Sequence, residues 1–281
     1  NHPVEILKGS ELLRLACGAE RIVIAVEKNK LEAVEILNSK NYNLKIKNLE
    51  IVSLPVRYPQ DSERTLAGMM TGRQLKKAES VLSAGVLVEH VATAFAVYEA
   101  VYLNKPLYER VVTVGGPCVV EPKNVWARVG TSAADLIRSA KGLMREPERI
   151  IFGGPMTGKT IEHLEIPVTK AVRGVLALPP QLTVSGDPEP CIRCGWCADV
   201  CPESLNAEAI VRAVQNEDEN LAREFGIEAC VDCGCCTYVC PSKIQMGLFI
   251  QKGKRRIAVP GTTVPGSQNP APAVPGTVAM F

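Results

Sequence analysis

The sequence predicts an α/β protein with three parts: a parallel α/β unit, a small β-grasp module and a helical, cysteine-rich segment. Three observations support this fold class. Helical and strand patterns alternate over the first hundred residues, which indicates a parallel sheet covered by helices. Short strands with a single helix follow, and nine of the 11 cysteines then fall between Cys191 and Cys240.

The composition is that of a globular protein with more than one domain. The chain has 281 residues, which predicts two or three compact units. Hydrophobic residues make up 46% and charged residues 22%, and the formal net charge is +2. This near balance gives no field that would attract nucleic acid, and aromatic residues at 5% are too scarce for base stacking.

The first part alternates between strands and helices. Apolar spacing predicts helices over residues 4–15 and 29–37, and β-branched runs predict strands over 21–26 and 48–54. Residues 55–83 are expected to be loop with one short helical patch. The stretch 86–103 contains Glu89, His90 and Glu99, so we expect a strand leading into a helix rather than a membrane span.

The middle part is predicted to be a β-grasp module, because its strands are short and only one helix accompanies them. Its expected elements are strands over 111–114, 118–120 and 125–129, a turn over 121–124, a helix over 132–140 and a strand over 149–152.

The domain boundaries follow from changes in composition. Residues 179–190 contain four prolines and are expected to be a linker, and helices are expected over 205–214 and 218–225. The end of the chain is rich in Pro, Gly, Ala, Val and Thr, which predicts a flexible tail. The predicted boundaries are 1–106 for the α/β unit, 107–178 for the β-grasp module and the strands after it, 179–190 for the linker, 191–253 for the cysteine segment and 254–281 for the tail.

The cysteine segment contains two copies of one motif, C-x2-C-x2-C-x3-C-P, beginning at Cys191 and at Cys230. This spacing is typical of [4Fe–4S] ferredoxins, in which three close thiolates bind one cluster and the fourth reaches the other cluster. The spacing therefore predicts two clusters with crossed ligand sets. The ligands are Cys191, Cys194, Cys197 and Cys240 for cluster 1, and Cys230, Cys233, Cys236 and Cys201 for cluster 2.

Two other interpretations of the cysteines are structural zinc and disulfides. Zinc sites usually use two separated pairs and do not need a third cysteine followed by Cys-Pro. Disulfide scaffolds distribute their cysteines through short secreted chains. Cys235 falls outside the repeat, and we expect it to be a bystander thiol. Clusters of this type carry single electrons, so the segment is predicted to be an electron relay.

Residues 153–160 match the phosphate-binding pattern GxxxxGK[ST]. A true phosphate loop must lead into a long helix. Here Pro167 would end such a helix after about two turns. We therefore expect a glycine turn after a strand, and nucleotide hydrolysis ranks last among the functions considered.

With these motifs in view, the chain resembles the C subunit of the Rnf (Rsx) electron-transport complex, from its first residues to about Lys252. The resemblance rests on ordered motifs in all three parts. Besides the two cysteine motifs, they are VEKNK at 26–30, YPQ at 58–60 with Glu63, TGR at 71–73, RVVTV at 110–114, VGT at 129–131, GGPM at 153–156 and PVTK at 167–170.

The resemblance implies a Rossmann-like flavin domain of the complex I type, an SLBB (soluble-ligand-binding β-grasp) module and a helical two-cluster ferredoxin domain. It also implies electron exchange between NAD(H) and ferredoxin through FMN and the clusters, coupled to ion transport. The expected partners are other subunits of an Rnf-type membrane complex, with ferredoxin or NAD(H) as redox partner. The expected location is peripheral, on the cytoplasmic face of the inner (plasma) membrane.

The resemblance also implies a set of residues near FMN or NAD(H). They match the family's E-x-N-K element, its YPQGGE loop and its N-V-x-T element: Glu27, Asn29, Lys30, Tyr58, Gln60, Glu63, His90 and Thr93. From spacing alone, the same residues would be a strand-to-helix junction and a surface loop.

Three departures from the family pattern concern the flavin. The loop glycines are replaced by Asp61 and Ser62, and His90 stands where the family has asparagine. The family's glycine-rich flavin loop is expected upstream of Asn1, because a chain that does not begin with methionine is expected to start further upstream. Two alternatives therefore stay open: a flavin-less iron–sulfur relay that docks on a partner complex, and a cobalamin reductase-like protein.

Overall fold

The computed structural model describes residues 2–72, 74–76, 79–183, 186–257 and 276–280. The chain divides into two compact units. Unit 1 comprises Asn1–Pro106, Gly226–Val231 and Lys254–Phe281, and unit 2 comprises Leu107–Phe225 and Asp232–Gly253. Within the described residues, no helix is both long enough and apolar enough to cross a membrane.

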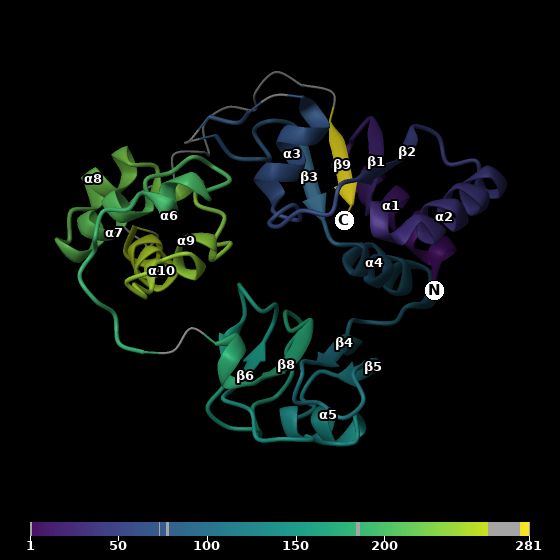
Figure 1. Ribbon diagram of the computed structural model, residues 1–281. Coiled ribbons are helices and arrows are strands. Elements are labelled where there is room, and N and C mark those ends of the chain that lie inside the picture. Colours follow the sequence, from purple (N-terminus) through teal and green to yellow (C-terminus); the bar gives the residue numbers. More distant parts are fainter. Residues whose placement is uncertain (1, 73, 77–78, 184–185, 258–275, 281) are drawn as a thin grey trace. The chain divides into compact units, whose positions relative to one another are not determined.

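Unit 1 is built on a parallel four-stranded sheet with the order β2-β1-β9-β3 (Figure 1). The strands are β1 (Arg21–Glu27), β2 (Leu49–Leu54), β3 (Val86–Glu89) and β9 (Thr277–Met280). Five consecutive residues of β1 are buried. A strand is buried on both faces when helices cover both sides of a parallel sheet. The predicted parallel α/β unit is thus present.

The helices of unit 1 lie on both sides of this sheet. They are α1 (Pro3–Cys17), α2 (Leu31–Leu44), α3 (Glu63–Thr71) and α4 (Val91–Leu103), with a short 3-10 turn η1 (Lys28–Lys30) after β1. Leu7, Leu37 and Ala94, from α1, α2 and α4, form one core with Ile22 and Ile24 of β1, and α3 packs on the opposite face.

Helices α1 and α4 approach each other closely at Gly9. A Cβ atom added to Gly9 would lie 1.8 Å from the carbonyl oxygen of Ala94. Leu7 and Ala94 are fully buried beside this crossing. Only glycine therefore lets the two helix backbones pack at this distance.

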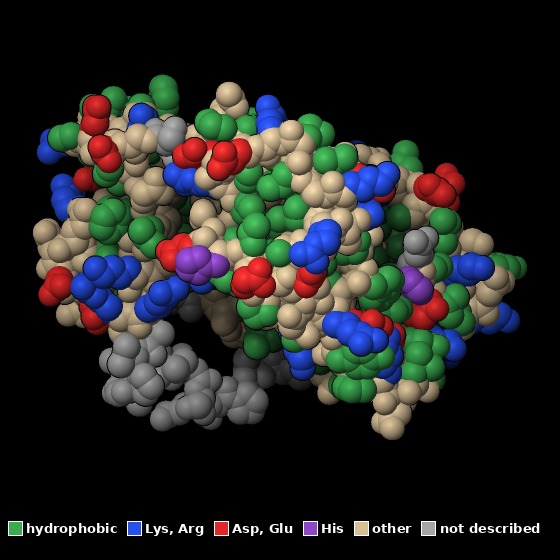
Figure 2. All heavy atoms as spheres, turned by 90° about the horizontal axis from the view of Figure 1, so that it is seen from below, with side chains coloured by type: hydrophobic (Ala, Val, Ile, Leu, Met, Phe, Trp, Pro, Cys, Tyr) green, Lys and Arg blue, Asp and Glu red, His purple; other side chains and the backbone are tan. Residues whose placement is uncertain are grey.

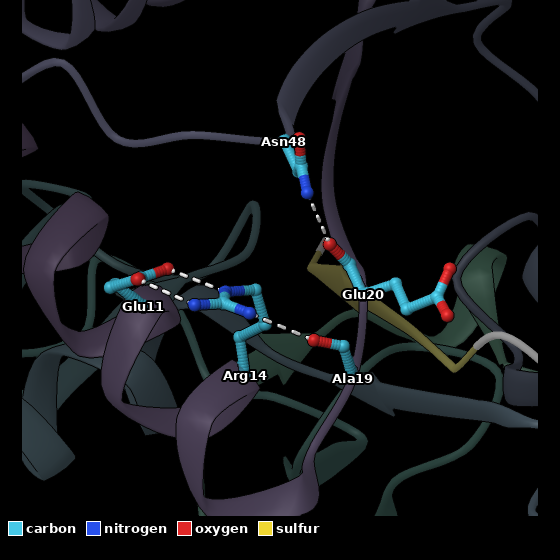
Figure 3. A network of polar contacts seen from close by, with 5 residues as sticks. All are labelled: Glu11, Arg14, Ala19, Glu20 and Asn48. Carbon is cyan, nitrogen blue, oxygen red and sulfur yellow. Dashed lines mark hydrogen bonds and ion pairs between the residues drawn. The ribbon is translucent and has the colours of Figure 1, made fainter.

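A polar network connects α1 to the start of the sheet (Figure 3). Arg14 donates two 2.8 Å hydrogen bonds to the Glu11 carboxylate and one of 2.9 Å to the carbonyl of Ala19. The hydrogen bonds that Arg14 donates to Glu11 raise the pKa of Arg14. The Asn48 side chain donates to the Glu20 carbonyl at 2.9 Å, which joins the residues that precede β1 and β2.

The predicted flexible tail is wrong for two stretches. Lys254 lies in helix α10 (Met246–Ile257), and Thr277–Met280 forms β9, between β1 and β3 (yellow in Figure 1). Val278 and Met280 are 0% exposed, because parallel pairing with two strands places them in the core. The rest of the predicted tail, 258–275, lies outside the described residues.

Unit 2 contains a five-stranded mixed sheet with the order β5-β4-β8-β6-β7. Two antiparallel hairpins, β4–β5 and β6–β7, flank β8, which runs parallel to β4 and antiparallel to β6. The elements are β4 (Glu109–Gly115), β5 (Lys123–Arg128), α5 (Ala133–Ser139), β6 (Arg149–Phe152), β7 (Lys159–Thr160) and β8 (Gly174–Leu178).

Two local predictions for this sheet need correction. Residues 118–120 do not form a strand, since only an isolated bridge joins Val119 to Leu143. The apolar character that suggested a strand comes instead from burial, because Cys118 and Val119 lie in the core under α5. Strand β5 begins at Lys123, so the predicted turn over 121–124 is shorter than expected.

The cysteine segment is mainly short helices. They are η2 (Pro180–Leu182), α6 (Trp196–Asp199), α7 (Ala207–Gln215), α8 (Glu219–Glu224), η3 (Ile227–Ala229), α9 (Cys235–Tyr238) and α10. The side chains of Asn206 and Asp218 accept backbone N–H groups at the starts of α7 and α8. These caps fix the starts of both helices, which lie one or two residues after the predicted starts.

Candidate metal centre

The two cysteine motifs adopt the same backbone conformation. Left-handed residues occur at matching positions: Arg193 and Asp232, two residues after the first cysteine, and Gly195 and Gly234, directly after the second. Each glycine begins a short helix, α6 or α9, which carries the third cysteine. The sequence repeat is therefore a structural repeat as well.

Four cysteines from both motifs line one pocket of about 350 Å³ in unit 2. Cys191, Cys194 and Cys197 come from the first motif and Cys240 from the second. These four residues are the crossed ligand set predicted for cluster 1. A [4Fe–4S] cluster requires four thiolates, so the donor set of this pocket fits the group.

Charged and polar residues that the sequence did not single out also line this pocket. Asn206 and Glu208 stand at the start of α7, and Arg212 follows one turn later, 3.9 Å from the Glu208 carboxylate. The backbone N–H of Arg193 donates to the Cys191 sulfur at 3.4 Å. The helix-capping pattern of Asn206 was visible in the sequence, but the direction in which α7 faces was not.

The thiols of the pocket differ in exposure. Cys191 and Cys194 are exposed, whereas Cys197 is buried. Burial raises the pKa of the Cys197 thiol, because the charged thiolate is disfavoured away from water. Metal binding must remove this proton, so assembly of a cluster here is linked to proton release.

Three predicted ligands of cluster 2 belong to unit 2. Cys201, at the end of the first motif, is close enough to Cys233 to raise its pKa electrostatically. The pKa of Cys233 is raised to about 11, first by burial and further by Cys235 and Cys201. Cys236 lies in the following helix, α9. The approach of Cys201 to the second motif is the geometry that crossed ligation requires.

The fourth predicted ligand, Cys230, belongs to the part of the chain assigned to unit 1. Its carbonyl accepts a hydrogen bond from the Lys254 ammonium group in the last turn of α10. The ligand set of cluster 2 stays a prediction. All 11 cysteines lie among the described residues and none forms a disulfide. Among these residues, no group of three or more His, Cys, Asp or Glu is placed to hold a single metal ion.

The residues expected near FMN lie at the carboxyl ends of the parallel strands in unit 1. Glu27 ends β1, and Lys30 of the next turn forms a 3.3 Å ion pair with it; Asn29 is in the same turn. Ligands of open parallel sheets usually bind at this edge. From β2 and β3 the chain continues into the remaining expected residues: Tyr58, Gln60, Glu63, His90 and Thr93.

The side chain of Gln60 shows whether the residues at this edge of the sheet suit a bound ligand. Its side chain is 5% exposed, and its Oε1 atom has no hydrogen-bond partner among the described residues. Its Nε2 atom is 3.8 Å from the sulfur of Met69. A buried carbonyl oxygen without a partner is costly, and a ligand N–H or O–H would satisfy it. This acceptor suits a hydrogen-bonding cofactor such as FMN.

Two of the departures from the family pattern have structural roles. Ser62 caps α3 by accepting the Thr65 backbone N–H, and His90 caps α4 through Nδ1, which accepts the Ala92 N–H at 3.0 Å. Serine and asparagine are the usual capping residues, so the imidazole replaces an amide in the same role. Asp61 is exposed.

The phosphate-loop pattern forms a β-hairpin. Phe152 of β6 pairs with Lys159 of β7, and Ile151 pairs with Thr160. Gly153, at φ 112°, makes the turn. Since Lys159 stands on a strand rather than at the start of a helix, the predicted glycine turn is confirmed.

The face of the molecule drawn in Figure 2 carries side chains of both charge signs. On the face drawn in Figure 2, basic and acidic side chains are interspersed with apolar ones. This mixture agrees with the net charge of +2.

Two protein-family models match this chain, one over its first part and one over the cysteine segment. Residues 1–99 match the family model described as the Nuo51 FMN-binding domain, and residues 183–241 match the model of a 4Fe-4S dicluster domain. A flavin-type domain and a two-cluster domain on one chain are typical of the electron-transfer class of proteins.

Several relatives match most of the chain, and all of those named here are C subunits of oxidoreductase complexes. The chain is 36% identical over 230 residues to the C subunit of the ion-translocating oxidoreductase complex of Erwinia tasmaniensis, covering 81% of the chain and 28% of that protein. It is 34% identical to the C subunit of the proton-translocating ferredoxin:NAD(+) oxidoreductase complex of Clostridium ljungdahlii and 36% to the corresponding ion-translocating oxidoreductase protein of Rhodobacter capsulatus, each over 72% of the chain. These two matches cover 44% and 38% of the relatives, so the chain spans less than half of the proteins it matches.

Over the part that these matches cover, the chain is similar to the C subunits of Rnf-type ion-translocating oxidoreductases. The resemblance found in the sequence motifs is thus confirmed, and the two matched models are those of an FMN-binding domain and of a 4Fe-4S dicluster domain, in agreement with the cofactors expected.

Proposed function

We propose that the chain passes electrons between an FMN/NAD(H) site and the ferredoxin side of an Rnf-type membrane complex through two [4Fe–4S] clusters. The main support is the pocket lined by Cys191, Cys194, Cys197 and Cys240. A cluster bound by these thiolates supplies one-electron transfer. The protein would provide the four sulfurs from two turns of the same backbone conformation.

The flavin side of the proposal depends on unit 1. The carboxyl edge of its sheet would hold the cofactor, with the Gln60 carbonyl as a buried acceptor and with the Glu27–Lys30 pair beside it. Bound FMN would exchange electron pairs with NAD(H) and single electrons with the clusters. The partners would be the other subunits of the complex, with ferredoxin or NAD(H) as redox partner, on the cytoplasmic face of the membrane.

The domain boundaries 1–106, 107–178, 179–190 and 191–253 are part of this proposal. For the module at 107–178, the topology supports a β-grasp fold of the SLBB type. A first hairpin, a helix and a second hairpin are followed by a last strand that inserts between the hairpins, parallel to the first strand. This connectivity is the one that defines the β-grasp fold.

The crossed ligand sets give a sharp test of the clusters. Anaerobically prepared chain should contain about eight iron atoms, four per cluster. Cys191→Ser and Cys240→Ser should each remove the same cluster, and the double variant should keep as much iron as either single variant. If each motif instead binds its own cluster, the double variant would lose both. Cys17→Ser, at an exposed thiol of α1, is the matched control and should lose no iron.

A second candidate, a relay that has lost its flavin, is favoured by the exposed Asp61 in the predicted flavin loop. A carboxylate there adds negative charge near a cofactor phosphate. Acid extraction of the anaerobic native protein decides between the two. About one FMN per chain supports the NAD(H)-linked function, and intact clusters without flavin support the relay.

A further inference from the structure

The turn of the second cysteine motif is covered, whereas the same turn of the first motif is open. Residues 193–196 are exposed, and the matching residues 232–235 are partly or fully buried. The two turns share one backbone conformation, with φ 84° at Gly195 and 79° at Gly234. The difference in exposure therefore comes from what packs against each turn.

The tip of the β6–β7 hairpin packs against the second turn. A Cβ atom added to Gly234 would lie 2.6 Å from the carbonyl oxygen of Met156 and 3.8 Å from the Met156 Cβ atom. A Cβ atom added to Gly195 would have no atom of the described residues beyond its chain neighbours within 4 Å. Gly234 and Met156 both belong to unit 2, and only glycine allows the two backbones to approach this closely.

The hairpin tip is the segment that matches the phosphate-loop pattern. The Gly158 backbone N–H closes it by donating to the Gly154 carbonyl at 2.8 Å. Met156 is partly buried, although the residues on either side of it are exposed. The closed turn thus holds one apolar residue against the second cysteine turn, where it excludes water.

We propose that the hairpin tip, centred on Met156, is a shield that keeps water from cluster 2, and that cluster 1 is the solvent-facing cluster. The inference rests on the proposed two-cluster function. The shell around a metal site controls the access of solvent, and with it the stability and potential of the site. Cys233, a predicted ligand of cluster 2, directly precedes Gly234. Cluster 2 should therefore lose iron more slowly than cluster 1.

The shield should also lower the potential of cluster 2. Reduction adds one electron, and with it negative charge, to a cluster and its sulfurs. Burial away from water disfavours the more highly charged state, and solvent exposure is one of the features that set a cluster potential. Removal of the shield should consequently raise the potential of this cluster.

The test measures iron loss to an excess of an iron(II) chelator, on the full chain with its clusters assembled anaerobically. The native chain should lose iron in two phases of about half each, with cluster 2 in the slow phase. Gly234→Ala should accelerate the slow phase roughly tenfold or more, as outer-shell changes at metal sites do. Gly195→Ala is the matched control, because it places alanine in the same left-handed conformation without a neighbour, and it should leave the slow phase unchanged.

A redox titration followed by electron paramagnetic resonance gives a second measurement. Gly234→Ala should raise the potential of one cluster by a threefold to tenfold shift of the one-electron equilibrium, at most about 59 mV. Met156→Ser leaves the cysteine turn itself unchanged and should accelerate the slow phase in the same direction. Thr157→Ala, at the exposed neighbouring position, should change neither quantity. If Gly234→Ala takes up only half the iron, Met156→Ser decides alone.

The possible outcomes separate the inference from the function on which it rests. A single phase of iron loss in the native chain, or a slow phase that Met156→Ser leaves unchanged, would overturn the shield and leave the two-cluster function intact. Equal acceleration of the slow phase by Gly195→Ala and Gly234→Ala would attribute the effect to strain in the turns and would also overturn it. A native chain that binds no iron would refute the proposed function itself.

Discussion

Replacement of Gln60 by methionine should stabilise the cofactor-free protein and weaken its binding of FMN. The Gln60 side chain is 5% exposed, and its Oε1 atom has no hydrogen-bond partner among the described residues. An unsatisfied buried polar group costs about 1–3 kcal/mol. Methionine is unbranched, similar in length and apolar, so it can occupy the same space without that cost.

The variant also loses one contact, and the strength of that contact determines the net change in the free energy of unfolding. Gln60 Nε2 lies 3.8 Å from the Met69 sulfur, a weak acceptor, so little is lost with it. We therefore expect the free energy of unfolding to rise by about 1 kcal/mol, which corresponds to roughly 2–4 °C in Tm for a domain of this size. Added FMN should raise the Tm of the native chain, and the variant should need at least about tenfold more FMN for the same rise, since the carbonyl acceptor is gone.

Thermal unfolding with and without FMN measures both effects. Gln74→Met is the matched control, since Gln74 is exposed in the same unit and should change neither Tm nor the response to FMN. A lower Tm for Gln60→Met would contradict the expected cost of the unpaired Gln60 carbonyl. An undiminished response to FMN would show that this carbonyl does not accept a hydrogen bond from the ligand.

Three further predictions concern packing and titration. Gly9→Ala should lower the free energy of unfolding by about 2 kcal/mol in urea titrations despite better helix propensity, because its Cβ would lie 1.8 Å from the Ala94 carbonyl oxygen. In cluster-free chain at pH 8, mass spectrometry should find Cys233 alkylated later than the exposed thiols of the first motif, with a rate that still increases towards pH 11, because its pKa is about 11. Lys141 lowers the pKa of Glu121 below its ordinary 4.5 by hydrogen bonding, so Lys141→Met should raise that pKa in an NMR titration; an unchanged value would contradict the contact.

The cysteine repeat was predictable because its spacing alone encodes the chemistry. Two copies of one ligand pattern imply two clusters, and the known reach of the fourth thiolate implies the crossed sets. The structure places Cys240 in the pocket of the first motif, as that rule anticipates. The presence of Asn206, Glu208 and Arg212 in the same pocket was not predictable, because it depends on the direction in which α7 faces.

Strand β9 could not be predicted from the local sequence. Thr277–Met280 is four residues long and comes after a run rich in proline and glycine, so no periodicity marks it as a strand. Its stability comes from two partners, β1 and β3, that are distant in the sequence. The Arg21 side chain, for instance, donates to the Thr277 hydroxyl across 256 positions. Composition predicts flexibility correctly only when no distant partner exists.

The position of β9 also determines the order in which the protein can mature on the ribosome. The strands β1, β2 and β3 are synthesised before β9, although β9 lies between β1 and β3 in the sheet. β3 ends at Glu89 and β9 begins at Thr277, so roughly 190 residues lie between them. At about 5–20 residues per second, their synthesis takes on the order of ten to forty seconds. During that time the nascent sheet has unpaired edges, which attract other strands. The β-grasp module and most of the cysteine segment are complete before the flavin-type domain can close, so the electron relay would form first.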